Sequence, residues 1–193
     1  MSEGGPSTPG SSAAASAGRR DGDRQRVYDA EDAAFVETSY ADRLGERGCQ
    51  WLFDHLVALP WWAAATSGPV PVLRAARSDS TRSTAVVAGD RTEVRIGPGM
   101  DQAHVLSHEL AHLLATAGAS HGGIFRAAHL DVATLVLGAH GADRLLDFYG
   151  RAGLAIAARA WPVPPGHGPG GLLAVWQARQ ALDALRSRAT EPL

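Results

Sequence analysis

Apolar side chains recur every three to four residues over most of this chain, which is the period of a helix that buries one face. Glycine and proline residues interrupt the period and divide it into separate stretches. Trp61 and Trp62, which follow the helix expected over residues 49–59, are expected to fill the edge of the core. We expect helices over residues 24–44, 49–59, 101–118, 121–137, 142–160 and 172–188.

The stretch between the second and third helices follows a different pattern. Short runs rich in valine and isoleucine alternate there with turn residues, which is typical of β-strands. We expect strands over residues 70–75, 83–88 and 92–97. The pattern therefore predicts an α+β domain in which a small, mainly antiparallel, three-stranded sheet packs with helices.

The two ends of the chain depart from these patterns. Residues 1–18 are almost entirely serine, glycine, alanine and proline, and we expect a disordered tail over residues 1–22. The remainder, 23–193, is long enough for one domain with a sizeable core. Within it, residues 159–171 are rich in proline and glycine and are expected to form a loop before the last helix.

Composition narrows the possible partners. The formal net charge is −2, and no run of basic residues is present, which argues against a nucleic-acid partner. No apolar run approaches the roughly 18 residues of a membrane span, and no secretory signal precedes the domain. The single cysteine, Cys49, rules out an internal disulfide, which fits a reducing compartment. Cys49 begins an apolar helix, and we expect its side chain in the hydrophobic core. We therefore expect a cytoplasmic protein without a membrane partner.

One segment combines this periodicity with chemistry. It reads Ser107-His108-Glu109-Leu110-Ala111-His112. On a helix, His108 and His112 lie one turn apart on the same face, at the spacing two imidazoles need to hold one zinc ion at about 2.0–2.1 Å. In His-Glu-x-x-His sites the glutamate, here Glu109, is a general base and not a ligand.

The residues around this segment favour a helix with two distinct faces, one buried and one carrying the histidines. Asp101 is expected as its N-cap and Gly118 as the residue that follows its last turn. The opposite face from the histidines carries a leucine stripe that would be buried. The stripe consists of Leu106, Leu110, Leu113 and Leu114.

A catalytic zinc site needs a third protein ligand besides the two histidines. His121 is the leading candidate, because the two glycines after it permit close approach of the backbone and Phe125 would pack beneath its ring. His129 is the main rival, but on a helix over 121–137 it would lie about 12 Å from His121. Asp131 and His140 are further alternatives.

These motifs resemble those of a known family. His-Glu-Leu-Ala-His followed by His-Gly-x-x-Phe is similar to the SprT-like and Spartan-like metallopeptidase domains, and still more to short bacterial putative metallohydrolases. The latter also begin with Arg-Asp and Arg-Val-Tyr-x-Ala-Glu segments, here Arg20-Asp21 and residues 26–31. The resemblance implies a zincin-like fold with His121 as third ligand. Gly123-Ile124 replaces the Pro-Glu that the family often has.

These observations predict a zinc-dependent metallohydrolase, most simply a metallopeptidase, whose partner is a protein or peptide substrate. His108, His112 and His121 would bind Zn²⁺ and Glu109 would act as general base. Tyr149, His140 and Arg126 are candidates for stabilising the oxyanion. The alternatives are an inactive, zinc-stabilised binding or scaffold domain and, by resemblance, a Spartan-like protease acting on DNA-associated proteins. The oligomeric state stays open.

Overall fold

The computed structural model describes residues 21–88, 90–116, 120–166 and 168–189, and the part of the expected tail before residue 21 lies outside them. The described part is an α+β fold with a three-stranded sheet, as predicted. Its helices are α1 (Arg24–Phe35), the 3-10 helix η1 (Ser39–Ala41), α2 (Gly45–Val57), α3 (Pro60–Ala65), α4 (Ala103–Leu114), α5 (Gly123–Val136), α6 (Gly138–Arg151) and α7 (Gly171–Ala189). Its strands are β1 (Val72–Ala75), β2 (Thr84–Ala88) and β3 (Arg91–Ile96).

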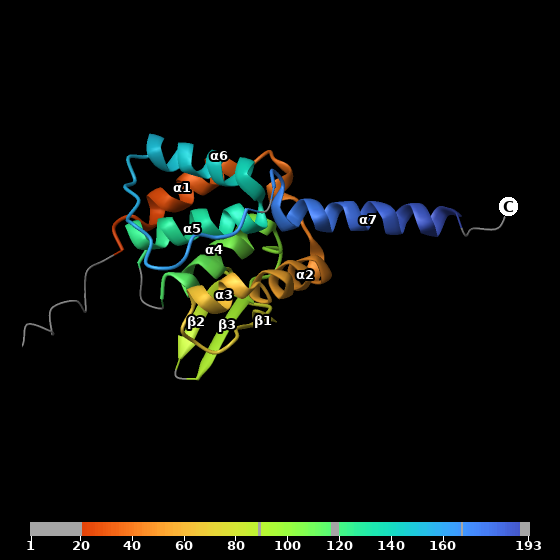
Figure 1. Ribbon diagram of the computed structural model, residues 1–193, viewed down its shortest axis with the longest axis horizontal. Coiled ribbons are helices and arrows are strands. Elements are labelled where there is room, and N and C mark those ends of the chain that lie inside the picture. The colour runs from red at the N-terminus through yellow and green to blue at the C-terminus, as the bar shows by residue number, and fades with distance from the viewer. Residues whose placement is uncertain (1–20, 89, 117–119, 167, 190–193) are drawn as a thin grey trace, which may run out of the picture.

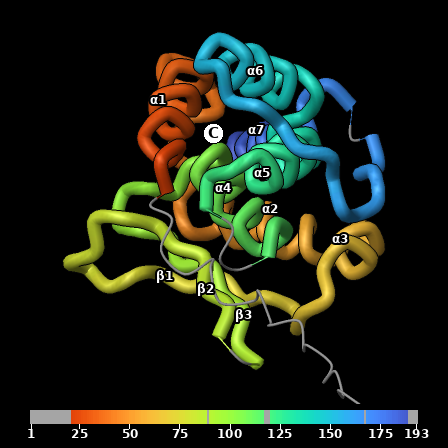
Figure 2. Tube along the Cα trace, turned by 90° about the vertical axis from the view of Figure 1, so that its left-hand side faces the viewer, coloured from red at the N-terminus to blue at the C-terminus, as the bar shows by residue number. Residues whose placement is uncertain are grey.

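Two helices form the centre of the domain. α4 packs against α5 on one side and against β2 and β3 on the other (Figure 1). α1 and α6 lie next to each other and close the core on the side of α5 that faces away from the sheet (Figure 2). The four leucines of the α4 stripe are all buried, as the sequence predicted. α4 therefore presents its leucines to the core while its histidine face meets α1 and α5.

The sheet is mixed, which corrects the expectation of a mainly antiparallel one. Its order is β1-β3-β2; β3 is antiparallel to β2 and parallel to β1. The reason is topological, because β1 and β2 run in opposite directions and the β2–β3 hairpin inserts β3 between them. β2 is consequently at one edge of the described sheet.

The helix expected over residues 24–44 is in fact interrupted. α1 ends at Phe35, Glu37 has a positive φ of 66°, and η1 follows. α2 then begins at Gly45, earlier than expected, and continues through Gly48. A Cβ at Gly48 would come within 3.2 Å of the Trp176 ring, so this glycine permits close packing of α7 on α2 and does not mark a break.

Asp101 serves a different helix from the one expected. The N-cap of α4 is Gln102, and no side chain caps it. The Asp101 carboxylate instead accepts hydrogen bonds from the Gly45 backbone N–H (2.8 Å) and from Arg43 Nε (2.6 Å). It therefore satisfies the first N–H group of α2, 56 residues earlier in the chain.

Other boundaries shift in similar ways. α4 ends at Leu114, and the expected terminator Gly118 lies outside the described residues. α6 spans Gly138–Arg151 instead of 142–160, and an irregular segment then crosses α5.

Trp61 and Trp62 belong to α3 and are buried, as is Cys49, so the prediction that they fill the core is confirmed. Within the described ranges no helix has the length and apolarity to cross a membrane.

Candidate metal centre

Three histidines converge at the face of α4 that meets α1 and α5. His112 Nε2 lies 3.1 Å from His108 Nε2, and His121 Nε2 lies 3.3 Å from the same atom. Three nitrogens bound tetrahedrally to one zinc ion at 2.0–2.1 Å would lie about 3.3–3.4 Å apart. The structure therefore brings together the three histidines predicted as ligands: the two separations from His108 are close to those of a zinc site, and all three ligand atoms lie within 4.8 Å of one another.

The chain between α4 and α5 delivers His121 to this point. Thr116, just after α4, has a positive φ of 68°, and Gly122 is the N-cap of α5. The next residue, Gly123, accepts a hydrogen bond from Ala157 N–H, and a Cβ there would come within 3.0 Å of that nitrogen. This glycine therefore lets a later segment of the chain seal the start of α5 directly behind His121.

Phe125 forms the floor beneath all three imidazoles. Its ring centroid is 4.4 Å from that of His112, 4.8 Å from that of His121 and 4.9 Å from that of His108. The sequence predicted the contact with His121, and the structure extends it to the other two rings. Since Phe125 is fully buried, it limits the positions that the three rings can adopt.

Two carboxylates lie behind the histidines, and neither of them was predicted from the sequence. Glu31 of α1 accepts a hydrogen bond from His108 Nδ1 (2.8 Å), and Asp21 accepts one from His121 Nδ1 (2.5 Å). A carboxylate at Nδ1 fixes the proton there and leaves the Nε2 lone pair free for a metal. Asp21 lies within the range expected to be a disordered tail. The signal was present, because both residues belong to the Arg-Asp and Ala-Glu segments that carried the family resemblance.

The protonation of the three rings differs. Burial would lower the pKa of His108, but the Glu31 carboxylate outweighs this and raises it. Burial and the neighbouring histidines lower the pKa of His112 to about 3, and burial lowers that of His121. A proton on His108 Nε2 can be donated to only one neighbour at a time, whereas a divalent cation binds all three lone pairs. The donor set therefore fits a metal better than a proton.

The main rival, His129, belongs to a buried network on the other side of His108. Its Nδ1 lies 2.8 Å from Tyr149 Oη and 3.3 Å from Glu31 Oε1, and Tyr149 Oη–H donates to the same carboxylate oxygen at 3.4 Å. Glu31, His108 and His129 could also hold an ion, but His108 would then have to give up the Nδ1 proton that Glu31 accepts. We therefore favour the three-histidine group.

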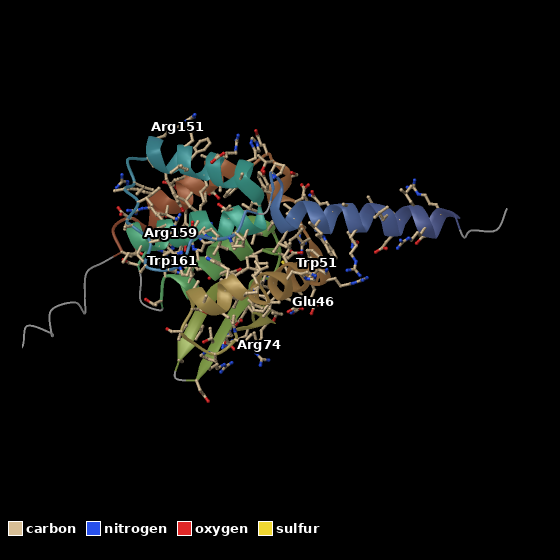
Figure 3. All side chains as sticks on the ribbon, viewed as in Figure 1. Glu46, Trp51, Arg74, Arg151, Arg159 and Trp161 are labelled. Atoms are coloured by element: carbon tan, nitrogen blue, oxygen red, sulfur yellow. The ribbon has the colours of Figure 1, made fainter. Side chains whose placement is uncertain are left out.

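The remaining rivals lie elsewhere. Asp131 accepts two hydrogen bonds from Arg159 (2.9 and 3.0 Å) and one from Trp161 Nε1 (2.8 Å). Arg159 and Trp161, both labelled in Figure 3, belong to the segment after α6, which these bonds tie to α5. His140 is exposed on α6, and neither possible metal group includes it. The contacts with Arg159 and Trp161 give Asp131 a structural role.

The predicted oxyanion candidates do not line the site either. Tyr149 is fully buried in the network with Glu31. Arg126 is buried as well, and its guanidinium donates to Asp23 and to the backbone oxygens of His121 and Ala155. Arg126 therefore positions the His121 loop and does not face a substrate.

A groove gives access to the histidines. A hollow of about 440 Å³ is lined by Arg24 and Tyr28 of α1, by residues 83–87 along β2, and by Glu109, Leu113, His112 and His121. A second hollow of about 530 Å³ adjoins it and shares Arg24, Tyr28, Ser83 and Glu109. Together they form a groove between α1 and the edge strand β2, with α4 as its floor.

Glu109 lies where the two hollows meet. Burial raises its pKa to about 7, although the nearby His108 charge acts in the opposite direction. A carboxylate with that pKa exchanges a proton readily near neutral pH. On the other wall, the Tyr28 ring packs against His108 (5.4 Å between centroids) and His121 (5.2 Å), and the Arg24 guanidinium lies over the Tyr28 ring at 5.5 Å. Tyr28 belongs to the Arg-Val-Tyr-x-Ala-Glu segment, but its place beside the histidines was not predicted from the sequence.

Comparisons with protein-family models, with curated proteins and with solved structures find no match to this chain. The resemblance to SprT-like domains therefore stays a prediction, and the geometry of the three histidines and their groove is what bears on function.

Proposed function

We propose that this protein is a zinc-dependent hydrolase and, more specifically, a metallopeptidase. The observation that carries the proposal is the convergence of three Nε2 lone pairs, from His108, His112 and His121, beside a carboxylate in an open groove. Three nitrogen ligands with a position left for water are typical of catalytic zinc sites, while structural sites use four protein ligands. Asp21 and Glu31 would orient two of the imidazoles.

Zinc bound there would supply a Lewis acid that polarises a carbonyl and makes a water molecule more acidic. Glu109 would accept a proton from that water and pass it to the leaving amine. Tyr28 and Arg24 replace the earlier candidates as the groups that would donate to the carbonyl oxygen, since both line the groove across from Glu109. Within the described ranges, the Tyr28 hydroxyl makes no hydrogen bond that would compete with this role.

The edge strand supports a peptide as substrate. β3 pairs with one edge of β2, and no described strand pairs with the other edge, which lies along the groove. An extended peptide can pair with such an edge through its backbone, so that binding needs no particular side chain. The peptide would then pass the three histidines with its carbonyl groups held by β2. The groove supports this arrangement better than it supports a small compact substrate.

Metal content and cleavage, measured on the same variants, test the proposal. We expect about one zinc per chain, by elemental analysis, in the wild type and in Glu109→Gln, and clear loss of zinc in His121→Ala. His140→Ala removes an exposed histidine outside the site and is the matched control. With an unbiased peptide library and mass spectrometry, we expect cleavage by the wild type and the control only.

Each other outcome has a definite meaning. Zinc in the wild type without cleavage of any peptide would favour the inactive, zinc-stabilised module. Cleavage by Glu109→Gln at the wild-type rate would refute its role as general base. Full zinc content in His121→Ala would return the third ligand to His129, and absence of zinc after reconstitution would refute the metal centre.

A further inference from the structure

α7 projects from the domain for most of its length (Figure 1). Only its first turns are docked: Leu172, Leu173 and Trp176 are buried against the body. The Trp176 ring packs on Trp51 of α2 at 5.6 Å between centroids, next to Gly48. Beyond Trp176 the side chains are exposed as far as residue 188. The helix is therefore anchored at one end and bare at the other.

The bare part carries an apolar stripe of its own, made of Val175, Ala178, Leu182 and Leu185. Val175 is 55% exposed, Leu182 54% and Leu185 61%. The spacing of three, four and three residues keeps these positions on one face of the helix. At 100° per residue, the centre of the stripe lies about 150° around the helix from the centre of the docked trio. The stripe consequently faces away from the body.

The stripe is not an extension of the docked face. The positions that continue the docked face along the helix are Gln180, Asp183 and Ser187, all of them polar. The side of α7 that meets the body thus turns polar where the helix leaves the body, while the opposite side stays apolar along the projecting part. Large apolar side chains arranged in a line are costly to leave in water, and such lines mark interaction surfaces.

The width of the stripe indicates what kind of surface it meets. Its positions alternate by three and four residues, as the a and d positions of a coiled coil do. This narrow seam suits a single partner helix. A helix that lies on a membrane has a broader apolar face, usually with aromatic residues, and the residues that flank this stripe are arginine and alanine.

Charge distinguishes a foreign helix from a second copy of α7. Arg179 and Arg186 lie along one flank of the stripe and Arg188 lies on the other, at positions that contact the partner's flanks in a coiled coil. Asp183, 3.7 Å from Arg186, is the acidic residue of this region. An antiparallel second copy would bring arginine against arginine, and a parallel one would bring Arg179 and Arg186 against alanines, so neither orientation gives them an acidic partner. A helix with acidic flanks would instead pair with these arginines.

We propose that the projecting part of α7 is a docking helix for another protein, and that it binds an amphipathic helix with an apolar seam and acidic flanks. The surface is separate from the metal centre, because α7 contributes no residue to the groove. Binding would bury Val175, Leu182 and Leu185 and place acidic side chains beside Arg179 and Arg186.

Two synthetic helical peptides test the proposal with the full chain. They share leucines at the seam positions and differ only in their flanks, which are glutamate in one and lysine in the other. By fluorescence anisotropy at low salt, we expect the acidic peptide to bind at least about tenfold more tightly than the basic one. Leu182→Glu is expected to abolish binding, and Leu146→Glu on α6, which replaces another half-exposed leucine, is the matched control.

A charge exchange gives a second, independent test. The double variant Arg179→Glu, Arg186→Glu is expected to reverse the preference between the two peptides while zinc content stays unchanged. Equal binding of both peptides, or an unchanged preference in the double variant, would overturn the proposal. So would a dimer, detected by sedimentation, that Leu182→Glu dissociates, because a second copy would then occupy the stripe. Binding to anionic lipid vesicles that depends on Leu182 would equally overturn it in favour of a membrane surface.

Discussion

Removal of the Asp21 carboxylate isolates the contribution of the hydrogen bond behind His121. Asp21 accepts from His121 Nδ1 at 2.5 Å and from the His121 backbone N–H at 3.2 Å. Its side chain is 26% exposed, and that of His121 is 6% exposed. Loss of such a partner weakens metal binding by about 10- to 100-fold. Because water partly screens this carboxylate, we expect the lower part of that range for Asp21→Ala, about 10- to 30-fold or 1.4–2 kcal/mol.

Competition with a chromophoric zinc chelator at neutral pH measures the effect. Asp21→Asn keeps an acceptor oxygen without the charge, so its zinc affinity should fall between that of the wild type and that of Asp21→Ala. Asp29→Asn is the control, since Asp29 is exposed on α1 and accepts a hydrogen bond only from Gln25, within the described residues. If Asp21→Ala binds zinc within about twofold of that control, the hydrogen bond from His121 to Asp21 does not support metal binding.

Three further predictions follow from other contacts. Tyr28→Phe should lower kcat on the order of 100-fold with zinc content unchanged, if its hydroxyl donates to the developing oxyanion; unchanged kcat would exclude that role. For Asp101, burial would raise the pKa, but the hydrogen bonds from Arg43 and Gly45 outweigh it and hold the pKa below its ordinary value. The stability that Asp101 contributes is therefore complete above the unfolded-state pKa and is lost as pH falls through the folded-state pKa. In urea unfolding near neutral pH, Asp101→Asn should have a lower free energy of unfolding than the wild type, and the difference should shrink in acid. Burial raises the pKa of the Cys49 thiol to about 12, so a thiol reagent at pH near 8 should react with it only after denaturation, and rapid reaction of the native protein would contradict its burial.

The parts of this fold that depend on local pattern were predictable. The leucine stripe of α4 and the valine-rich strands follow from periods of 3.6 and 2, which the sequence displays directly. The convergence of His108 and His112 is likewise a property of one helix. These features needed no knowledge of how distant segments meet.

The contacts that complete the centre were not predictable in the same way. Glu31 meets His108 across 77 residues, and Asp21 meets His121 across 100. No local period marks a carboxylate that will stand behind a histidine. Asp101 illustrates the same limit, because its position before α4 is that of a good N-cap and only the tertiary structure assigns it to α2. The parallel pairing of β1 with β3 also depends on which side of β2 the chain returns to.

The position of α1 over the histidines has a consequence for how the molecule is assembled. Of the described helices α1 is synthesised before the others, yet α5 and α6 follow about a hundred residues later, and Tyr149 reaches Glu31 across 118 residues. Pairings this distant in the chain form late, because the intervening loop must close first. During synthesis, α4 would thus expose its histidines before the Glu31 carboxylate of α1 can fix the orientation of His108. Metal bound by the histidines before α1 has packed on them would exchange freely, and the packing of α1 would be the step that retains it.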